Sequence, residues 1–102
     1  MSIIRGTTPT IKYTFTKIDP HDIAIAYLTI KQNGELVLEK DISAMVVGDD
    51  YVEWSLTQEE TLGLRKKHPL DLQMRYRTTN GLAYATSHVK EDVEDINKDG
   101  EI

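Results

Sequence analysis

The sequence contains no cysteine among its 102 residues. This absence excludes a disulfide framework, a thiol nucleophile and a thiolate metal site, and it leaves the redox compartment open. No apolar run approaches the roughly 20 residues that a membrane span needs, and the N-terminus lacks the basic stretch and apolar run of a signal peptide. We therefore expect a protein that stays out of the membrane and is not exported through a signal peptide.

Basic residues are in the minority, with twelve Lys and Arg against seventeen Asp and Glu and a formal net charge of -5. The long-range field of such a chain repels nucleic acid and anionic lipid. We expect neither a nucleic-acid partner nor a membrane partner. The length suits one domain, and the short, spaced apolar clusters favour a folded chain over a disordered one.

The first strand signal is an alternation of apolar and polar residues from Ile11 to Thr16. Ile11, Tyr13 and Phe15 fall on one face of such a strand, and their polar neighbours fall on the other. Residues 2–5 precede a Thr-Thr-Pro break, so they form at most a short edge strand. A turn at Asp19 and Pro20 ends this part of the chain.

A hairpin is predicted where residues 23–31, IAIAYLTIK, are followed by Asn33 and Gly34. The β-branched residues and the Asn-Gly pair favour a strand over a helix, and apolar residues on both parities indicate a central strand covered on both sides for part of its length. A three-residue loop, 32–34, with Gly34 in the left-handed conformation gives the register that places all the apolar pairs on one face of the hairpin. The predicted cross-strand pairs are Lys31–Glu35, Ile30–Leu36 and Leu28–Leu38.

A second hairpin is predicted around a similar loop, Thr79, Asn80 and Gly81. Its register pairs Thr78 with Leu82, Tyr76 with Tyr84, and Met74 with Thr86. The same register leaves Gln73, Arg75 and Arg77 on the opposite face, away from the tyrosines. A stacking platform for single-stranded nucleic acid is disfavoured, because its aromatic and cationic side chains would lie on different faces.

Between the hairpins lie a weak strand at 44–47, an acidic turn at 48–50 and a strand at 51–56 that carries Trp54, the only tryptophan. The next residues, Thr57 to Glu60, form a capping box, which predicts one or two helical turns to about Leu64. This helix would cross from one sheet to the other.

The predicted fold is all-β: an immunoglobulin-like antiparallel β-sandwich of about seven strands with one short helical crossover. Residues 1–94 form this domain, and residues 95–102 form an acidic, flexible C-terminal tail. The predicted core is Ile11, Tyr13, Phe15, Leu28, Ile30, Leu36, Leu38, Val52, Trp54, Leu56, Leu72, Met74, Tyr76 and Tyr84.

The sequence shows no frame for catalysis around its three histidines, His21, His68 and His88. They stand beside turns or strand ends, without a Gly-x-Ser-x-Gly or similar motif. The carboxylates at 49–50 and 59–60 are explained by turn and helix-start chemistry. We expect no enzymatic activity, no catalytic residue and no cofactor.

One weak metal candidate lies in the final residues, 95–102, which read DINKDGEI. Asp95, Asn97 and Asp99 occupy positions one, three and five of an EF-hand-like calcium loop. The sequence stops at position eight, so the bidentate acid at position twelve is missing. An acidic tail is the simpler interpretation, and we predict no metal site.

The order of elements resembles small proteins encoded in prophages of Gram-positive bacteria and, more loosely, the N-terminal immunoglobulin-like domain of phage upper baseplate proteins. The resemblance is carried by four segments that span nearly the whole chain: RGTTPTIKYTFT at 5–16, DIAIAYLTIKQNGELVLEKD at 22–41, VEWSLTQEETLGL at 52–64 and NGLAYATSHVKEDV at 80–93.

This resemblance implies a phage structural protein, associated with the tail or baseplate, that acts by protein–protein assembly through self-association or with other phage structural proteins. It also implies that the protein is made in the bacterial cytoplasm and then incorporated in the virion. The edge strands near 2–5 and 44–47 are the expected pairing sites. The alternative is a free-standing sandwich module that binds carbohydrate or a host protein through loops at 20–22 and 48–51.

Overall fold

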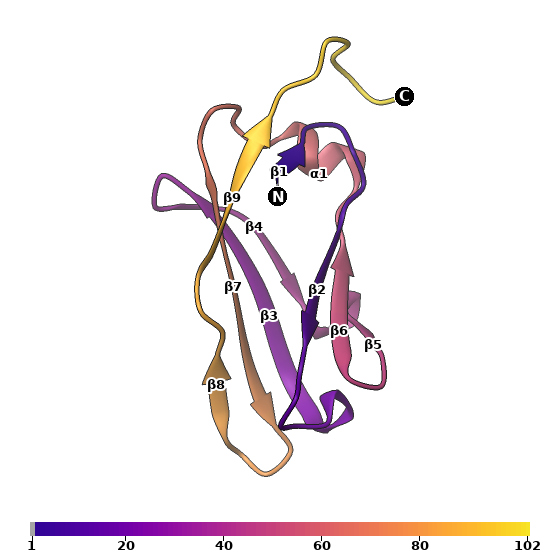
Figure 1. The fold of residues 1–102 in the computed structure, drawn as a ribbon, viewed down its shortest axis with the longest axis vertical. Helices are drawn as coiled ribbons and strands as arrows, with labels where there is room; N and C mark the ends of the chain where they lie inside the picture. The colour runs from indigo at the N-terminus through magenta and orange to yellow at the C-terminus, as the bar shows by residue number, and fades with distance from the viewer. Residues whose placement is uncertain (1) are drawn as a thin grey trace.

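Two β-sheets face each other in the computed structural model, which describes residues 2–102 (Figure 1). This part of the chain is mostly strand, and its helices are short. The strands are β1 (Ser2–Ile4), β2 (Thr10–Thr14), β3 (Ile23–Gln32), β4 (Glu35–Asp41), β5 (Val46–Val47), β6 (Tyr51–Ser55), β7 (Leu70–Thr78), β8 (Ala83–Ala85) and β9 (Val89–Glu94). The helices are the 3-10 turns η1 (Pro20–Asp22) and η2 (Ile42–Ala44) and the α-helix α1 (Gln58–Leu62).

The larger sheet has the strand order β1-β9-β7-β3-β4, with β8 also paired to β7, and the smaller sheet has the order β2-β6-β5. This is the B-E-D against G-F-C-C′ arrangement of an immunoglobulin-like sandwich. The structure has nine strands where about seven were predicted, and two features account for the difference. The chain changes sheets between β1 and β2, and β8 and β9 occupy successive stretches of the same edge of β7.

The predicted crossover helix is present between β6 and β7, and it is slightly shorter than expected. The Thr57 hydroxyl accepts a hydrogen bond from the Glu60 amide, and the Glu60 carboxylate accepts one from the Thr57 amide. Both halves of the capping box therefore satisfy amides that the first helical turn leaves unpaired. The helix ends at Leu62, because Gly63 caps it two residues before the predicted end.

The core lies between the two sheets and centres on Trp54, whose side chain is fully buried. Of the predicted core, Leu28, Ile30, Val52, Trp54, Leu56, Leu72 and Met74 are buried, and Ile11, Tyr13, Phe15, Leu38 and Tyr76 pack against them partly buried. The prediction is wrong for Leu36, which is 53% exposed, and for Tyr84, which is 41% exposed. Tyr84 stacks on Tyr76, but it stands on an edge strand that the narrower sheet does not cover.

The first hairpin differs from the predicted register. Gln32 pairs with Glu35, so the loop has two residues, and both Asn33 (φ 56°) and Gly34 (φ 79°) are left-handed. This is the geometry of a type I′ turn, which Asn-Gly favours. A bulge between Ile30 and Lys31 then pairs Ile30 with Leu38, where Leu36 was predicted, and places Leu36 opposite Lys31, on the side of the sheet that points away from the core. Leu36 is exposed for that reason.

The second hairpin has the predicted register. Tyr76 pairs with Tyr84, the Thr78 amide donates to the Leu82 carbonyl, and the Thr86 amide donates to the Met74 carbonyl. Gly81 adopts a φ of 87°, as the three-residue loop requires. This hairpin forms the end of the sandwich opposite α1 (Figure 1).

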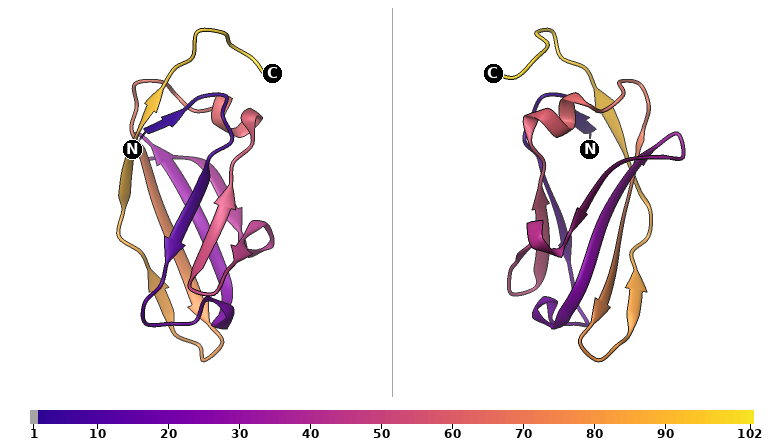
Figure 2. Two further views of the ribbon diagram at one scale, coloured as in Figure 1. Left: turned by 45° about the vertical axis from the view of Figure 1, so that its right-hand side comes forward. Right: turned by 180° about the vertical axis from the view of Figure 1, so that it is seen from behind.

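Residues 95–102 contain no helix or strand, as expected of a tail, but they contact the domain. The Asp95 carboxylate accepts from Arg5 at 2.5 Å and lies 3.2 Å from the Lys66 ammonium group. The backbone of Ile102 exchanges two hydrogen bonds with the Gln58 side chain. The segment passes over the end of the sandwich that carries α1 (Figure 2).

Candidate functional site

The most distinctive surface is the outer face of the larger sheet, formed by β3, β4, β7 and β8. Successive side chains of a strand point to opposite faces, so the residues between the buried ones on β3 and β7 point away from the core. On β7 these are Gln73, Arg75 and Arg77, and on β3 they include Tyr27 and Thr29. We call this surface the outer face.

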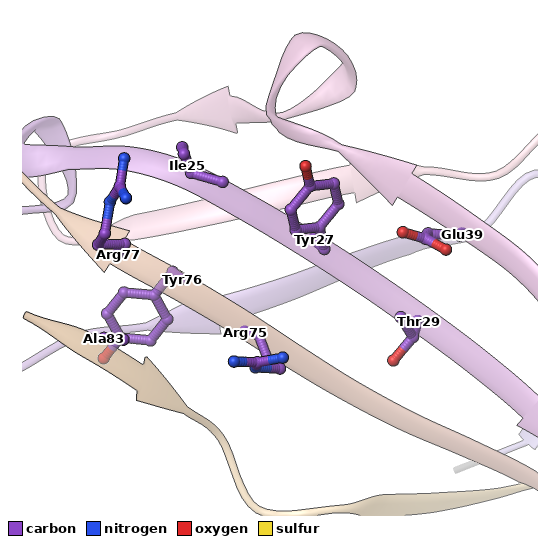
Figure 3. Close-up of a pocket in the computed structure, with 8 residues that line it drawn as sticks. All are labelled: Ile25, Tyr27, Thr29, Glu39, Arg75, Tyr76, Arg77 and Ala83. Atoms are coloured by element: carbon purple, nitrogen blue, oxygen red, sulfur yellow. The ribbon is translucent and has the colours of Figure 1, made fainter.

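A hollow of about 320 Å³ lies in the outer face. Figure 3 shows the residues that line it on β3, β4, β7 and β8, of which Tyr76 belongs to the core side of the sheet, where its ring contacts Phe15. They combine an aromatic ring that is 44% exposed, two guanidinium groups and a carboxylate. The lining residues are Ile25, Tyr27, Thr29, Glu39, Arg75, Tyr76, Arg77 and Ala83.

The charged groups of the outer face have few partners within the chain. Both Arg75 and Arg77 are exposed, and no ion pair among residues 2–102 involves either of them or Glu39. Surface arginines are often satisfied by water, but two of them beside an exposed tyrosine are typical of a contact surface. The outer face therefore offers charges that a partner can pair.

Asp41 adds a second carboxylate at the end of β4. Its side chain accepts hydrogen bonds from the hydroxyl and the amide of Ser43, which caps η2. These bonds lower the pKa of Asp41 below its ordinary value, because they stabilise the ionised form. Asp41 therefore carries its negative charge at neutral pH.

The histidines do not assemble into a site. His21 and His88 each lie 2.8 Å from a single carboxylate, Asp19 and Asp71 respectively, and both rings are more than half exposed. His68 contributes only its backbone carbonyl, which accepts from Gln32. These contacts are two surface hydrogen bonds and one structural hydrogen bond, and they supply no nucleophile–base geometry.

Two of the three candidate calcium residues, Asp95 and Asp99, pair with cations, and Asn97 is exposed. Both oxygens of Asp95 face cations, Arg5 and Lys66, and Asp99 lies 3.5 Å from Arg5. A carboxylate that is paired with a guanidinium group is not free to coordinate a metal. Among residues 2–102, no three Asp, Glu or His side chains gather in a metal-binding arrangement.

The two predicted pairing segments lie at sheet edges, but of residues 44–47 only Val46–Val47 is strand, because Ala44 belongs to η2. Among residues 2–102, β1 pairs only with β9, in parallel, and β5 pairs only with β6. Val46 is 55% exposed and Val47 is 36% exposed, so β5 presents both free backbone groups and apolar side chains.

Within the described part of the chain, no helix has the length and hydrophobicity to cross a membrane.

Sequence reasoning placed Arg75 and Arg77 on the outer side of β7 but missed the hollow they line. The missing partner was Tyr27, because the apolar residues of 23–31 indicated a strand covered on both sides. In the structure Ile25 is half-buried and Tyr27 is exposed, so the outer side of β3 is open. The sequence did contain a signal for this: Tyr27 and Leu28 are neighbours on one strand, so their side chains point to opposite faces of the sheet.

Comparison with known proteins supplies no relative from which a role could be transferred. No family model matches the chain, and a search of curated proteins finds no match. The features of the chain that bear on its function are therefore its fold, the outer face and the free sheet edges.

Proposed function

We propose that this chain is a non-catalytic structural protein of a phage particle, associated with the tail or baseplate, and that it acts through protein–protein contacts. The observation that carries the proposal is the outer face: an exposed tyrosine, Tyr27, with Arg75, Arg77 and Glu39 unpaired around a shallow hollow. A hollow of this shape and openness suits a protein surface better than a small substrate. The resemblance to prophage proteins supports the phage context.

The free sheet edges support the same proposal. An exposed edge strand can accept a strand from another chain, and its backbone groups then form hydrogen bonds with that partner. β5 has only two residues and β1 has three, so each edge limits pairing to a short stretch. Short edges favour a specific partner that is held by further side-chain contacts, and they protect against unlimited strand addition.

The test is the composition of phage particles. Particles would be induced from a lysogen that carries this gene, purified by density gradient, and analysed by quantitative mass spectrometry. We expect the chain at a fixed ratio to the tail proteins, and we expect it in isolated tails as well. A particle preparation that lacks the chain, from cells that express it, would contradict the proposal.

A binding module for carbohydrate is the second candidate, and one observation favours it. A polar hollow at the loop end of the sandwich is lined by Asp19, Asp22, Asn80 and Tyr84, among others, and an exposed aromatic ring beside acids and amides is a common sugar site. However, the Asp19 carboxylate already binds His21, and the Asn80 oxygen accepts from Thr78 and Leu82.

Glycan-array binding separates the two candidates. The sugar-binding role requires binding that Tyr84→Ala abolishes and that Tyr27→Ala leaves intact. Assembly requires no glycan binding. A positive array with this mutational pattern would replace the structural role with the carbohydrate role.

A further inference from the structure

Near Tyr27 the charges of the outer face are sorted by strand, whereas farther along β7 Asp71 lies opposite Lys31 and pairs with Lys90. β4 carries Glu39 and Asp41, β7 carries Arg75 and Arg77, and β3 lies between these two strands. Adjacent strands are about 4.8 Å apart. The face therefore has an acidic column and a basic column on the two sides of β3, roughly 10 Å from each other.

The strand register aligns these columns in one row. Tyr27 of β3 pairs with Asp41 on one side and with Arg75 on the other, so the three residues follow one another across the sheet. Residues directly opposite one another point to the same face of a sheet. Acid, tyrosine and arginine thus form a row whose midpoint is Tyr27.

A row of this kind is complementary to itself. A twofold axis that lies in the plane of the interface and runs along β3 exchanges the two sides of the row. The arginine column of one copy then lies over the acidic column of the other, and Tyr27 lies near Tyr27. In an isologous interface each such contact occurs twice.

We propose that the outer face binds the outer face of a second copy of this chain around a twofold axis along β3. In this dimer, Arg75 of each copy lies over Asp41 of the other, and Arg77 and Glu39 flank this pair on its two sides along the strands. The proposal rests on the assembly role above and names its first partner. The hollow beside Tyr27 leaves room for the partner's tyrosine ring.

The charges select this axis over its alternative. A twofold axis across the strands would place β7 over β7, so that Arg75 and Arg77 would face their own copies, and like charges at close range oppose association. Aligned packing of two sheets crosses their strands by about 30°. A twofold axis that is tilted from β3 crosses the strands of the two copies at twice the tilt, so a tilt of about 15° gives the usual crossing angle.

The size of the face predicts a weak dimer. Four strands about 4.8 Å apart and about 20 Å long cover roughly 400 Å² in plan, at the small end of specific interfaces. We therefore expect association in the micromolar range, with an affinity that falls as salt screens the charge pairs. Analytical ultracentrifugation should be run from about 5 μM to 1 mM, a range chosen to bracket dissociation constants from about 10 μM to several hundred μM.

The decisive experiment uses two complementary variants. The acidic variant carries Arg75→Glu and Arg77→Glu, and the basic variant carries Glu39→Arg and Asp41→Asn, of which the second keeps a capping oxygen for η2. Each variant alone loses the Arg75–Asp41 pairs and brings like charges close together across the interface, so it should bind itself at least about tenfold more weakly than the wild type. Mixed in equal amounts, they should form a heterodimer, because both columns are then complementary.

A matched control changes net charge away from the face. Lys17→Glu with Lys98→Glu lowers the net charge by the same amount as the acidic variant, and both lysines are exposed. This control should dimerise within about twofold of the wild type, because its changes are distant from the outer face. If Asp41→Asn unfolds the basic variant, Glu39→Arg alone serves, since Glu39 forms no ion pair among residues 2–102.

The axis itself can be tested by cross-linking, because the chain has no cysteine of its own. Thr29→Cys, on β3 near the axis, should cross-link with a short bismaleimide, whereas Ser55→Cys, on the smaller sheet, should not. A wild type that stays monomeric at 1 mM, or two variants that fail to form a heterodimer, would overturn the dimer. Either result leaves the proposed phage role intact, because mass spectrometry of particles tests that role independently.

Discussion

The indole nitrogen of Trp54 donates a hydrogen bond to the backbone carbonyl of Asp41 over 3.1 Å. Trp54 belongs to the smaller sheet and Asp41 ends β4 of the larger one. The single tryptophan therefore fills the space between the sheets and also ties one sheet edge to the other sheet. A buried indole that keeps its hydrogen bond avoids the cost of an unpaired donor.

Trp54→Ala should lower the free energy of unfolding by about 3–5 kcal/mol, because it leaves a large cavity in the core. Trp54→Phe should cost less, since the ring still packs and only the hydrogen bond and part of the volume are lost. Urea denaturation followed by circular dichroism measures both. A near-native stability of Trp54→Ala would contradict the central place of this residue in the core.

Gln32 is fully buried, and each of its side-chain polar atoms is paired. Its amide nitrogen donates to the carbonyls of Arg65 and His68, and its oxygen accepts from the Arg65 amide, each at 2.8 Å. Gln32→Leu should destabilise the domain by about 2 kcal/mol, because it leaves backbone groups of the 65–68 loop without these partners. Lys31→Leu, on the exposed neighbour, should stay within about 0.5 kcal/mol.

The second hairpin shows what a turn sequence can predict. Gly81 has a φ of 87°, and no atom lies within 4 Å of the position that a Cβ would occupy. The cost of Gly81→Ala is therefore purely conformational, about 1 kcal/mol. Gly63 has a φ of -73°, which suits alanine, so Gly63→Ala should be neutral or slightly stabilising. Equal losses in thermal unfolding for both variants would contradict this assignment.

The same Asn-Gly pair closes both hairpins, yet the sequence predicted only one register correctly. At 79–81 the Asn80 side chain accepts from its own turn, and the three-residue loop forms as expected. At 33–34 the neighbouring Gln32 is drawn inward by Arg65 and His68, which belong to a distant loop. Local rules fix the options for a turn, and tertiary contacts choose among them.

The outer face could be predicted only in part for a related reason. Alternation on β7 places Arg75 and Arg77 outward, and this needs no tertiary information. Whether Tyr27 is covered depends on how many layers pack on β3, and the chain places its second sheet on the opposite side alone. An apolar strand pattern indicates burial but does not say which face remains open.

The C-terminal segment gives a prediction for acid stability. A hydrogen bond from the Ile96 amide, together with Arg5 and Lys66, lowers the pKa of Asp95 to about 2. A carboxylate whose pKa is lower in the folded state stabilises the fold fully at any pH above its pKa in the unfolded state. This contribution is lost as the pH falls toward its pKa in the folded state. Asp95→Asn should therefore shift the urea midpoint downward at pH 6, and the difference from the wild type should vanish between about pH 4 and pH 2.

Asp92→Asn is the control for this measurement, since it removes an exposed carboxylate that has no ion pair among residues 2–102. It alters the net charge by the same amount without touching Arg5 or Lys66. If Asp95 binds the tail to the domain through these two cations, only Asp95→Asn should also speed amide exchange across residues 95–102. A difference from the wild type that persists unchanged at pH 2, or equal exchange in both variants, would show that Asp95 does not hold the segment in place.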